Sequence, residues 1–165
     1  MSKTKKNLMD AFAGESQANR KYTAYAKQAE KEGLAQVAKL FRAVAEAETI
    51  HAHTLLRQAG KIGNTMENLK DAIGGEDYEY TSMYPSMIAD AEQEGEKSAA
   101  RFMGWVSQVE KMHSDLYQKA LQSEGKVAEV DYYICAVCGY THEGPHEDDC
   151  PVCKAKSTAF YKMAS

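Results

Sequence analysis

Two Glu-x-x-His motifs, Glu48-x-x-His51 and Glu110-x-x-His113, each lie on the apolar stripe of a segment with helical periodicity. In a helix, residues three positions apart share a face, so each motif directs one carboxylate and one imidazole toward the same point. A charged glutamate on an apolar stripe is costly unless it is paired or binds a metal ion. We therefore interpret both motifs as pairs of metal ligands.

A single Glu-x-x-His motif also arises by chance on solvated helix faces, but this sequence holds two. A lone glutamate precedes each motif at a similar distance, Glu15 before the first and Glu79 before the second. A Glu from each of two helices plus Glu-x-x-His from each of two others is the ligand pattern of ferritin-like di-iron and di-manganese bundles. By this match we predict a site for two metal ions. Its candidate ligands are Glu15, Glu48, His51, Glu79, Glu110 and His113.

Apolar periodicity and glycine breaks predict a mainly α fold with four long helices. Short breaks at Gly33 and Gly60 indicate antiparallel neighbours. Pro85 is expected to start, kink or locally break the third helix. We predict a ferritin-like four-helix bundle with a long crossover, formed by residues 1–128. The expected ranges are 3–32 and 35–59 for the first two helices, 61–75 for the crossover and 97–123 for the fourth helix.

A separate small module, residues 129–165, is predicted after the bundle, where the pattern changes to short β-type pieces. It is too short to fold on an apolar core alone, so we expect a metal ion to hold it together. All four cysteines of the chain belong to it, as two Cys-x-x-Cys pairs. In a cytosolic protein such pairs are more often metal ligands than disulfides. The candidate ligands are Cys135, Cys138, Cys150 and Cys153.

Four thiolates suit either zinc or iron, and their spacing does not decide between the two metals. A zinc ribbon is therefore the alternative to a mononuclear iron site. We favour iron because the preceding helices carry a redox-type ligand pattern and because an aromatic shell could shield a redox centre. His142 and His146, between the pairs, are expected to be exposed loop residues rather than ligands. The residues of the expected shell are Tyr132, Tyr133, Tyr140, Pro151 and Phe160.

Length and charge bound the function classes further. The 165 residues allow one domain with a small appendage, and the net charge of −4 argues against a nucleic-acid partner. No apolar run reaches membrane-spanning length and no signal peptide opens the chain, so we expect a cytoplasmic protein without membrane association. There is no Gly-x-Gly-x-x-Gly fingerprint for a dinucleotide. Electrons for any redox reaction must therefore come from an external donor.

Together these motifs resemble the rubrerythrins, a family that joins a ferritin-like di-iron bundle to a C-terminal rubredoxin-like iron domain. The resemblance covers nearly the whole chain. Besides the two Glu-x-x-His motifs, it rests on residues 13–18 (AGESQA), residues 79–85 (EYTSMYP) and the pairs CAVCGY and CPVC. It implies a peroxidase in oxidative-stress defence, in which two iron ions give two electrons to hydrogen peroxide and the cysteine-bound iron resupplies them.

The resemblance also implies partners for this chain. A rubredoxin or an NAD(P)H-dependent reductase is the expected electron donor, so that peroxide reduction is linked to NADH. A homodimer is expected, with the tail iron of one subunit approaching the di-iron site of the other.

The chemical roles of the ligands follow from this resemblance. Glu48 and Glu110 are expected to bridge the two iron ions. Tyr22, seven residues after Glu15, could hydrogen-bond a ligand or supply a proton, and it could equally be a core tyrosine. The expected terminal ligands are Glu15, His51, Glu79 and His113.

Two positions depart from the family pattern. Ser82 stands where the family commonly has a second carboxylate, which exchanges with a histidine as the oxidation state changes. We therefore predict that His51 stays bound in both states. Glu76, one turn before Glu79, could compensate for the missing carboxylate, but we favour a solvated position for it beside Asp77. Lys154 stands where a glycine is usual, which would cost roughly 1 kcal/mol in a left-handed conformation.

Three function classes remain open. Peroxide reduction is favoured because it gives a role both to the helical ligand set and to the fused cysteine tail. Oxidation or storage of ferrous iron needs no tail, but the symmetric ligand set left by Ser82 would suit it. The third class is a non-redox protein whose tail is a zinc ribbon.

Overall fold

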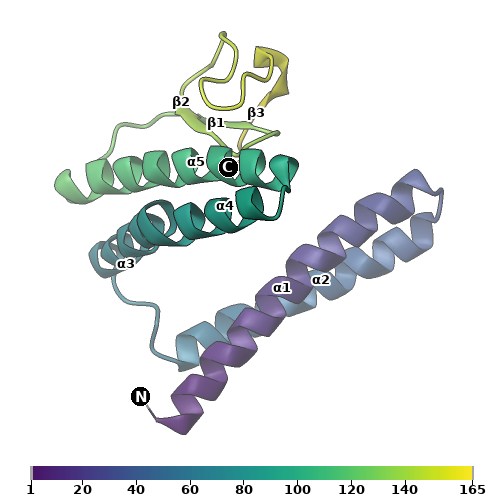
Figure 1. Ribbon diagram of the computed structural model, residues 1–165. Helices are drawn as coiled ribbons and strands as arrows, with labels where there is room; N and C mark the ends of the chain where they lie inside the picture. The colour runs from purple at the N-terminus through teal and green to yellow at the C-terminus, as the bar shows by residue number, and fades with distance from the viewer. Residues whose placement is uncertain (1, 165) are drawn as a thin grey trace. The chain divides into compact units, whose positions relative to one another are not determined.

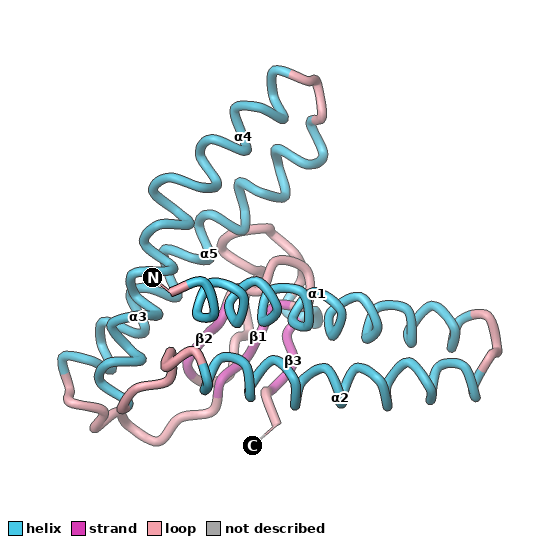
Figure 2. Tube along the Cα trace, turned by 90° about the horizontal axis from the view of Figure 1, so that it is seen from below, coloured by secondary structure: helices cyan, strands magenta, loops and turns pink. Residues whose placement is uncertain are grey.

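The computed structural model describes residues 2–164, and the chain divides into two compact units between Gly63 and Asn64. The first unit is an antiparallel hairpin of two helices, α1 (Lys3–Lys31) and α2 (Ala35–Gln58). Figures 1 and 2 both show these helices side by side along their length. The turn between them uses Gly33 at φ 75°, a left-handed conformation that glycine adopts without strain.

Small side chains hold the hairpin together. Alanines fill the helix interface, which lets the two backbones approach closely. Asn19 of α1 also forms hydrogen bonds to α2. Its side-chain amide donates to the Ala45 carbonyl at 2.7 Å and to the Thr49 hydroxyl at 2.8 Å. The hairpin is thereby fixed in register, with the lone glutamate of α1 opposite the motif of α2. The buried alanines are Ala26, Ala29, Ala38, Ala45 and Ala52.

The second unit begins with a helix where the sequence predicts a crossover. α3 (Thr65–Tyr78) starts at a capping box in which Asn64 and Glu67 each bond the other's backbone amide with a side-chain oxygen. The predicted crossover over residues 61–75 is therefore wrong in extent. Gly74 and Gly75 lie inside the helix, near its C-terminal end. The capping box at the opposite end starts the helix despite the low helix propensity of these glycines.

Pro85 reshapes the helix that carries Glu79. A π-helical turn, η1 (Glu79–Met83), joins α3 to α4 (Tyr84–Gln93), and Pro85 lies in the first turn of α4. Proline has no backbone N–H, so the regular hydrogen-bond ladder is interrupted just before it. The predicted local break at Pro85 is confirmed. α3, η1 and α4 form one segment that packs against α5 (Lys97–Gln122).

The tail is a three-stranded antiparallel sheet with the order β2-β1-β3. Its core is continuous with α5, because Val109, 1 % exposed, packs in one cluster with the buried cysteines of the tail. The sheet accordingly lies beside α5 in Figure 1. The strands are β1 (Tyr132–Cys135), β2 (Thr141–Glu143) and β3 (Phe160–Lys162).

A mainly α fold with four long helical segments and a small C-terminal metal domain is thus confirmed for the described residues. The predicted domain boundary after residue 128 falls in the extended link between α5 and β1 and stays a prediction. Among residues 2–164, no helix has an apolar stretch long enough to cross a bilayer.

Candidate metal centres

Three of the predicted ligands meet in the first unit. Glu15 projects from α1, and Glu48 and His51 project from α2, with candidate ligand atoms within 4.8 Å of one another. Glu48 Oε2 lies 2.8 Å from His51 Nδ1, and the Glu48 side chain is only 15 % exposed. The i, i+3 spacing of the motif produces this pairing directly. The group offers two carboxylates and one imidazole to a metal ion.

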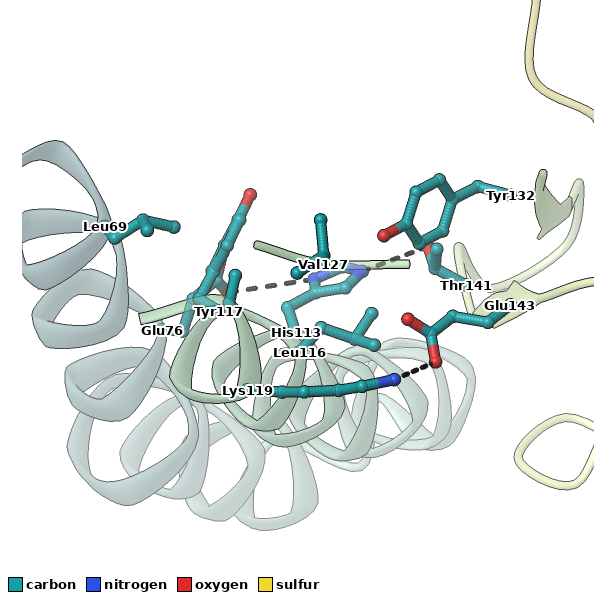
Figure 3. Close-up of a pocket in the computed structure, with 11 residues that line it drawn as sticks. Leu69, Glu76, His113, Leu116, Tyr117, Lys119, Val127, Tyr132, Thr141 and Glu143 are labelled. Atoms are coloured by element: carbon teal, nitrogen blue, oxygen red, sulfur yellow. Dashed lines mark hydrogen bonds and ion pairs between the residues drawn. The ribbon is translucent and has the colours of Figure 1, made fainter. Parts of the chain in front are cut away.

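A matching group lies in the second unit, where α5 supplies Glu110 and His113. His113 Nδ1 is 2.7 Å from Glu110 Oε2, the same pairing as in the first motif. The third member is Glu76 of α3, and the candidate ligand atoms of the three residues lie within 4.8 Å of one another. Figure 3 shows Glu76 and His113 facing each other along one side of a pocket of about 500 Å³.

Glu76 corrects the sequence prediction, which placed it in solvent. Its side chain is 19 % exposed, its Oε2 atom lies 3.8 Å from His113 Nδ1, and that oxygen has no hydrogen-bond partner in the described part of the chain. A buried carboxylate oxygen without a donor is costly, and a cation removes that cost. The neighbouring Asp77 has a structural role instead. It accepts a 2.6 Å hydrogen bond from the buried Ser114 of α5 and so helps to hold α3 against α5.

Glu79, the ligand expected from the sequence, lies near the same group. Burial and then the charge of Glu110 raise its pKa, while His113 lowers it. Ser82 is exposed on the π-helical turn. The second carboxylate beside Glu79 therefore comes from Glu76, three residues before it, and not from position 82.

Burial of the Glu76 carboxyl group should make the free energy of unfolding of the metal-free protein depend on pH. Burial and the Glu110 charge raise the pKa of Glu76 from 4.5 to about 7. Because the folded-state pKa is the higher one, the protonated carboxyl stabilises the fold below about pH 4.5, and this contribution is lost as the pH rises through about 7. E76Q should raise the free energy of unfolding at about pH 8 by roughly 1–2 kcal/mol. This figure is smaller than the full pKa shift implies, because solvent screens part of the charge.

Denaturant unfolding of the metal-free protein at several pH values measures this effect. E76Q should also flatten the pH dependence between about 4.5 and 7, although the raised pKa of His113 leaves a slope of the same sign. A variant whose stability follows that of the unmutated protein at every pH would contradict the burial argument.

Two tyrosines of the second unit lie close to the acidic group. Burial and then Glu110 raise the pKa of Tyr84, and burial and then Glu76 raise that of Tyr117. Both phenols therefore stay protonated and can donate hydrogen bonds. Sequence reasoning named Tyr22 instead, whose ring packs on Tyr25 and Phe41, each with centroids 6.2 Å apart. A role for Tyr22 at the metal site stays a prediction.

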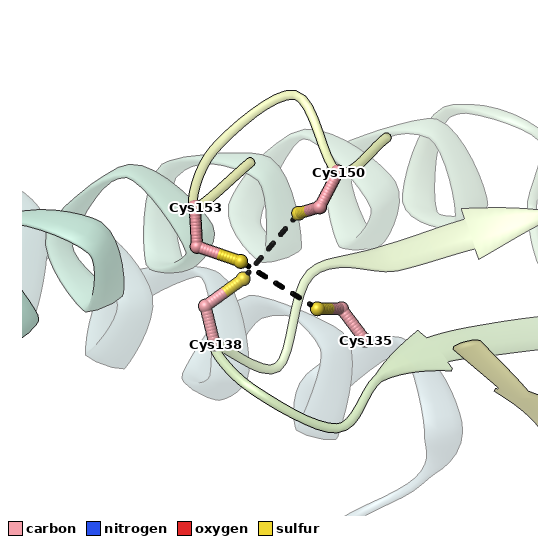
Figure 4. A group of neighbouring side chains, drawn as sticks. All are labelled: Cys135, Cys138, Cys150 and Cys153. Atoms are coloured by element: carbon pink, nitrogen blue, oxygen red, sulfur yellow. Dashed lines mark hydrogen bonds between the residues drawn. The ribbon is translucent and has the colours of Figure 1, made fainter. Parts of the chain in front are cut away.

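The four cysteines meet in the tail, as Figure 4 shows. Cys135 and Cys153 have Sγ atoms 3.7 Å apart, and Cys138 and Cys150 have Sγ atoms 3.6 Å apart. A disulfide needs about 2.05 Å, whereas a tetrahedral site with metal–sulfur distances of about 2.3 Å has sulfur atoms roughly 3.8 Å apart. The thiolates are therefore arranged for one metal ion.

The histidines between the cysteine pairs are not exposed, contrary to the prediction. His142 lies in β2, and both it and His146 are half-buried. The His146 ring packs on Phe160, with centroids 4.4 Å apart, and on Tyr140 at 6.0 Å. They extend the aromatic shell, to which Tyr140 and Phe160 belong as predicted. Among the described residues, the metal-binding group of the tail consists of cysteines alone.

Lys154 has the left-handed conformation considered for it, with φ 62°. Its ammonium group donates to the Pro151 carbonyl at 2.8 Å on the exposed surface. We expect K154G to stabilise the iron-loaded tail by about 0.5–1 kcal/mol, because glycine adopts this conformation without a Cβ clash. Denaturant unfolding followed by the visible absorption of the cysteine-bound iron measures the change. A loss of stability would show that the Pro151 contact matters more than the strain.

The comparisons with known proteins agree with this geometry. The family model described as Rubrerythrin matches residues 6–121, and the one described as Rubrerythrin, rubredoxin-like domain, matches residues 133–161. The chain is 37 % identical to Rubrerythrin-1 of Clostridium acetobutylicum, over 92 % of this chain and 90 % of that protein. It is 34 % identical to Rubrerythrin of Nitratidesulfovibrio vulgaris, with the same two coverages.

A solved structure agrees as well. The partially reduced state of nigerythrin matches with a TM-score of 0.59 at 30 % identity, over 99 % of this chain and 88 % of that one.

Proposed function

This chain belongs to the rubrerythrin family, and from this premise we propose that it reduces hydrogen peroxide to water at a di-iron site, with electrons relayed through the cysteine-bound iron. The family binds iron, and the chain has both a carboxylate–histidine ligand set and a rubredoxin-like site. The observation that carries the proposal is that the single helix α5 contributes to both candidate metal sites of the second unit. It supplies Glu110 and His113 to one group and packs Val109 against the cysteines of the other.

The proposed ligand set keeps the six residues predicted from the sequence and adds Glu76. As the family resemblance implies, Glu48 and Glu110 would be the bridging carboxylates, and Glu76 would be a further terminal ligand from the second unit. Carboxylates in excess of histidines balance the charge of the metal ions, which makes burial of that charge tolerable. The other terminal ligands are Glu15, His51, Glu79 and His113.

The reaction needs two electrons and two protons for each peroxide. Two iron ions held by these residues would supply the two electrons that cleave the oxygen–oxygen bond, and two protons would complete two water molecules. As an iron ligand Glu76 would be a carboxylate, because a bound cation displaces the proton that the metal-free group holds with its pKa of about 7. The phenol of Tyr84, whose pKa is raised by burial and then by the charge of Glu110, stays neutral and would be able to donate a hydrogen bond within the site. The pocket lined by Glu76 and His113 is wide enough to admit hydrogen peroxide.

The other two function classes lose support. Iron oxidation would suit the symmetry of the two helical groups, which each hold two carboxylates and one histidine, but it gives no role to the four-cysteine site. A zinc ribbon accounts for the cysteines alone and leaves the two carboxylate–histidine groups without a role. We propose an external rubredoxin or NAD(P)H-dependent reductase as electron donor and a homodimer as the assembly.

Anaerobic turnover tests the proposal. Iron-loaded protein, supplied with a rubredoxin and an NADH-dependent rubredoxin reductase, should consume one NADH for each hydrogen peroxide. The matched control is the double variant E110A/H113A, which keeps the tail and lacks the second ligand group. Fast consumption of added ferrous iron without NADH turnover would favour iron oxidation. Native protein with zinc in the tail would contradict the relay.

A further inference from the structure

A buried hydrogen-bond network lies between α3 and α5, beside the carboxylate–histidine group of the second unit. Ser114 of α5 is 1 % exposed and donates its hydroxyl hydrogen to Asp77 Oδ1 of α3 at 2.6 Å. This length is typical of a hydrogen bond to a charged carboxylate, which is stronger than one between neutral groups. The Gln118 side-chain amide donates to the same hydroxyl oxygen at 3.0 Å. The Ser114 hydroxyl therefore uses its one hydrogen and also accepts a bond, which fixes its orientation.

Each member of this pair adjoins a candidate metal ligand. Ser114 follows His113 on α5, and Asp77 follows Glu76 on α3. One hydrogen bond thus joins the two helices at the level where an imidazole and a carboxylate converge, with Glu76 Oε2 3.8 Å from His113 Nδ1. The Oε2 atom has no hydrogen-bond partner within residues 2–164. The position of α3 therefore decides where this oxygen lies relative to the imidazole.

Asp77 is anchored through its backbone as well. Thr81 of η1 donates its hydroxyl hydrogen to the Asp77 carbonyl. The chain changes from α-helical to π-helical geometry two residues after Asp77, at Glu79. An anchor at this point confines the irregular turn to the residues that follow it and leaves Glu76 on the regular helix.

We propose that Ser114 is a positioning residue for the metal site: through Asp77 it holds α3 at the spacing at which Glu76 and His113 bind the same metal ion. The inference rests on the proposed ligand set. Ser114 and Asp77 are not themselves ligands, because the converging ligand atoms of this group come from Glu76, Glu110 and His113. Loss of the Ser114 hydroxyl would leave the Asp77 carboxylate without its donor and release α3 at this level.

Binding of cobalt(II) to the helical ligands measures this role without turnover. Zinc first fills the four-cysteine site of the metal-free protein, and cobalt(II) is then titrated while its visible absorption is followed. S114A should weaken cobalt(II) binding roughly tenfold, as expected for loss of a group that orients a metal ligand. D77N keeps an oxygen that accepts from Ser114 and should stay within about threefold of the unmutated protein. S98A, at an exposed serine of α5, should bind cobalt(II) like the unmutated protein.

A double-mutant cycle separates positioning of Glu76 from a general loosening of the fold. E76Q removes the carboxylate through which Ser114 is proposed to act, so S114A/E76Q should bind cobalt(II) as weakly as E76Q alone. If S114A weakens binding by the same factor with and without E76Q, Ser114 does not act through Glu76, and the proposal is overturned. Denaturant unfolding of the metal-free proteins is the second readout. An S114A protein that loses stability but keeps the full cobalt(II) affinity would also overturn it.

The same titrations distinguish this inference from the ligand assignment on which it rests. If E76Q weakens cobalt(II) binding and S114A does not, Glu76 remains a ligand and only the role of Ser114 is overturned. If E76Q binds cobalt(II) like the unmutated protein, Glu76 is not a ligand, and the assignment and the inference are overturned together. Absence of peroxide turnover in the iron-loaded protein would overturn the proposed reaction alone.

Discussion

Replacing Glu76 with alanine is expected to lower the rate of peroxide reduction on the order of a hundredfold. The Oε2 atom of Glu76 is buried without a hydrogen-bond donor and lies 3.8 Å from His113 Nδ1, a position that a metal ion explains and solvent does not. E76A removes one carboxylate from the second ligand group. Iron content and single-turnover oxidation by peroxide should both fall.

The control for E76A is S82A, at the position where the family pattern suggested a carboxylate. Ser82 is exposed, so S82A should keep iron content and rate within about twofold of the unmutated protein. E76D, which keeps the charge on a shorter side chain, should be intermediate. If S82A loses activity while E76A retains it, the ligand assignment in the second unit is incorrect.

A comparable loss is expected for C150S, but in a different step. Cys150 is fully buried in the cluster that joins the tail to α5, and the metal supplies much of the folding free energy of so small a module. C150S should lose the tail iron and its visible absorption, and turnover with the external donor should fall on the order of a hundredfold. Peroxide should still oxidise a chemically reduced di-iron site once.

K154G provides the comparison for C150S because it alters the same cysteine turn without removing a thiolate. This variant should keep the tail iron and the donor-dependent rate. Atomic absorption for iron, together with NADH consumption, separates the two variants. Full donor-dependent turnover in a C150S protein that lacks tail iron would show that electrons bypass the tail.

The parts of the site that were predictable are the local ones. Glu48 pairs with His51, and Glu110 with His113, because i, i+3 spacing on a helix fixes their separation without any tertiary information. The cysteine turns are equally local, as is the strained conformation of Lys154. Helix ends at Gly33 and in the last turn of α5 fell within a residue or two of the prediction.

What the sequence did not reveal depends on contacts between distant segments. Glu76 meets His113 only because α3 packs on α5, and the π-helical turn before Pro85 changes the face on which later residues lie. The contact between His113 and Thr141 spans 28 positions along the chain, and no spacing rule predicts it. The start of α3 was missed for a different reason: its capping box was a local signal that two glycines obscured.

Anaerobic stopped-flow mixing of the fully reduced, iron-loaded protein with hydrogen peroxide tests the central claim most directly. The visible charge-transfer absorption of the ferric cysteine-bound iron reports when electrons leave the tail. We predict a rapid, near-stoichiometric return of this absorption, following oxidation of the di-iron site. A tail that stays reduced while peroxide is consumed, or peroxide that is not consumed at all, would contradict the account.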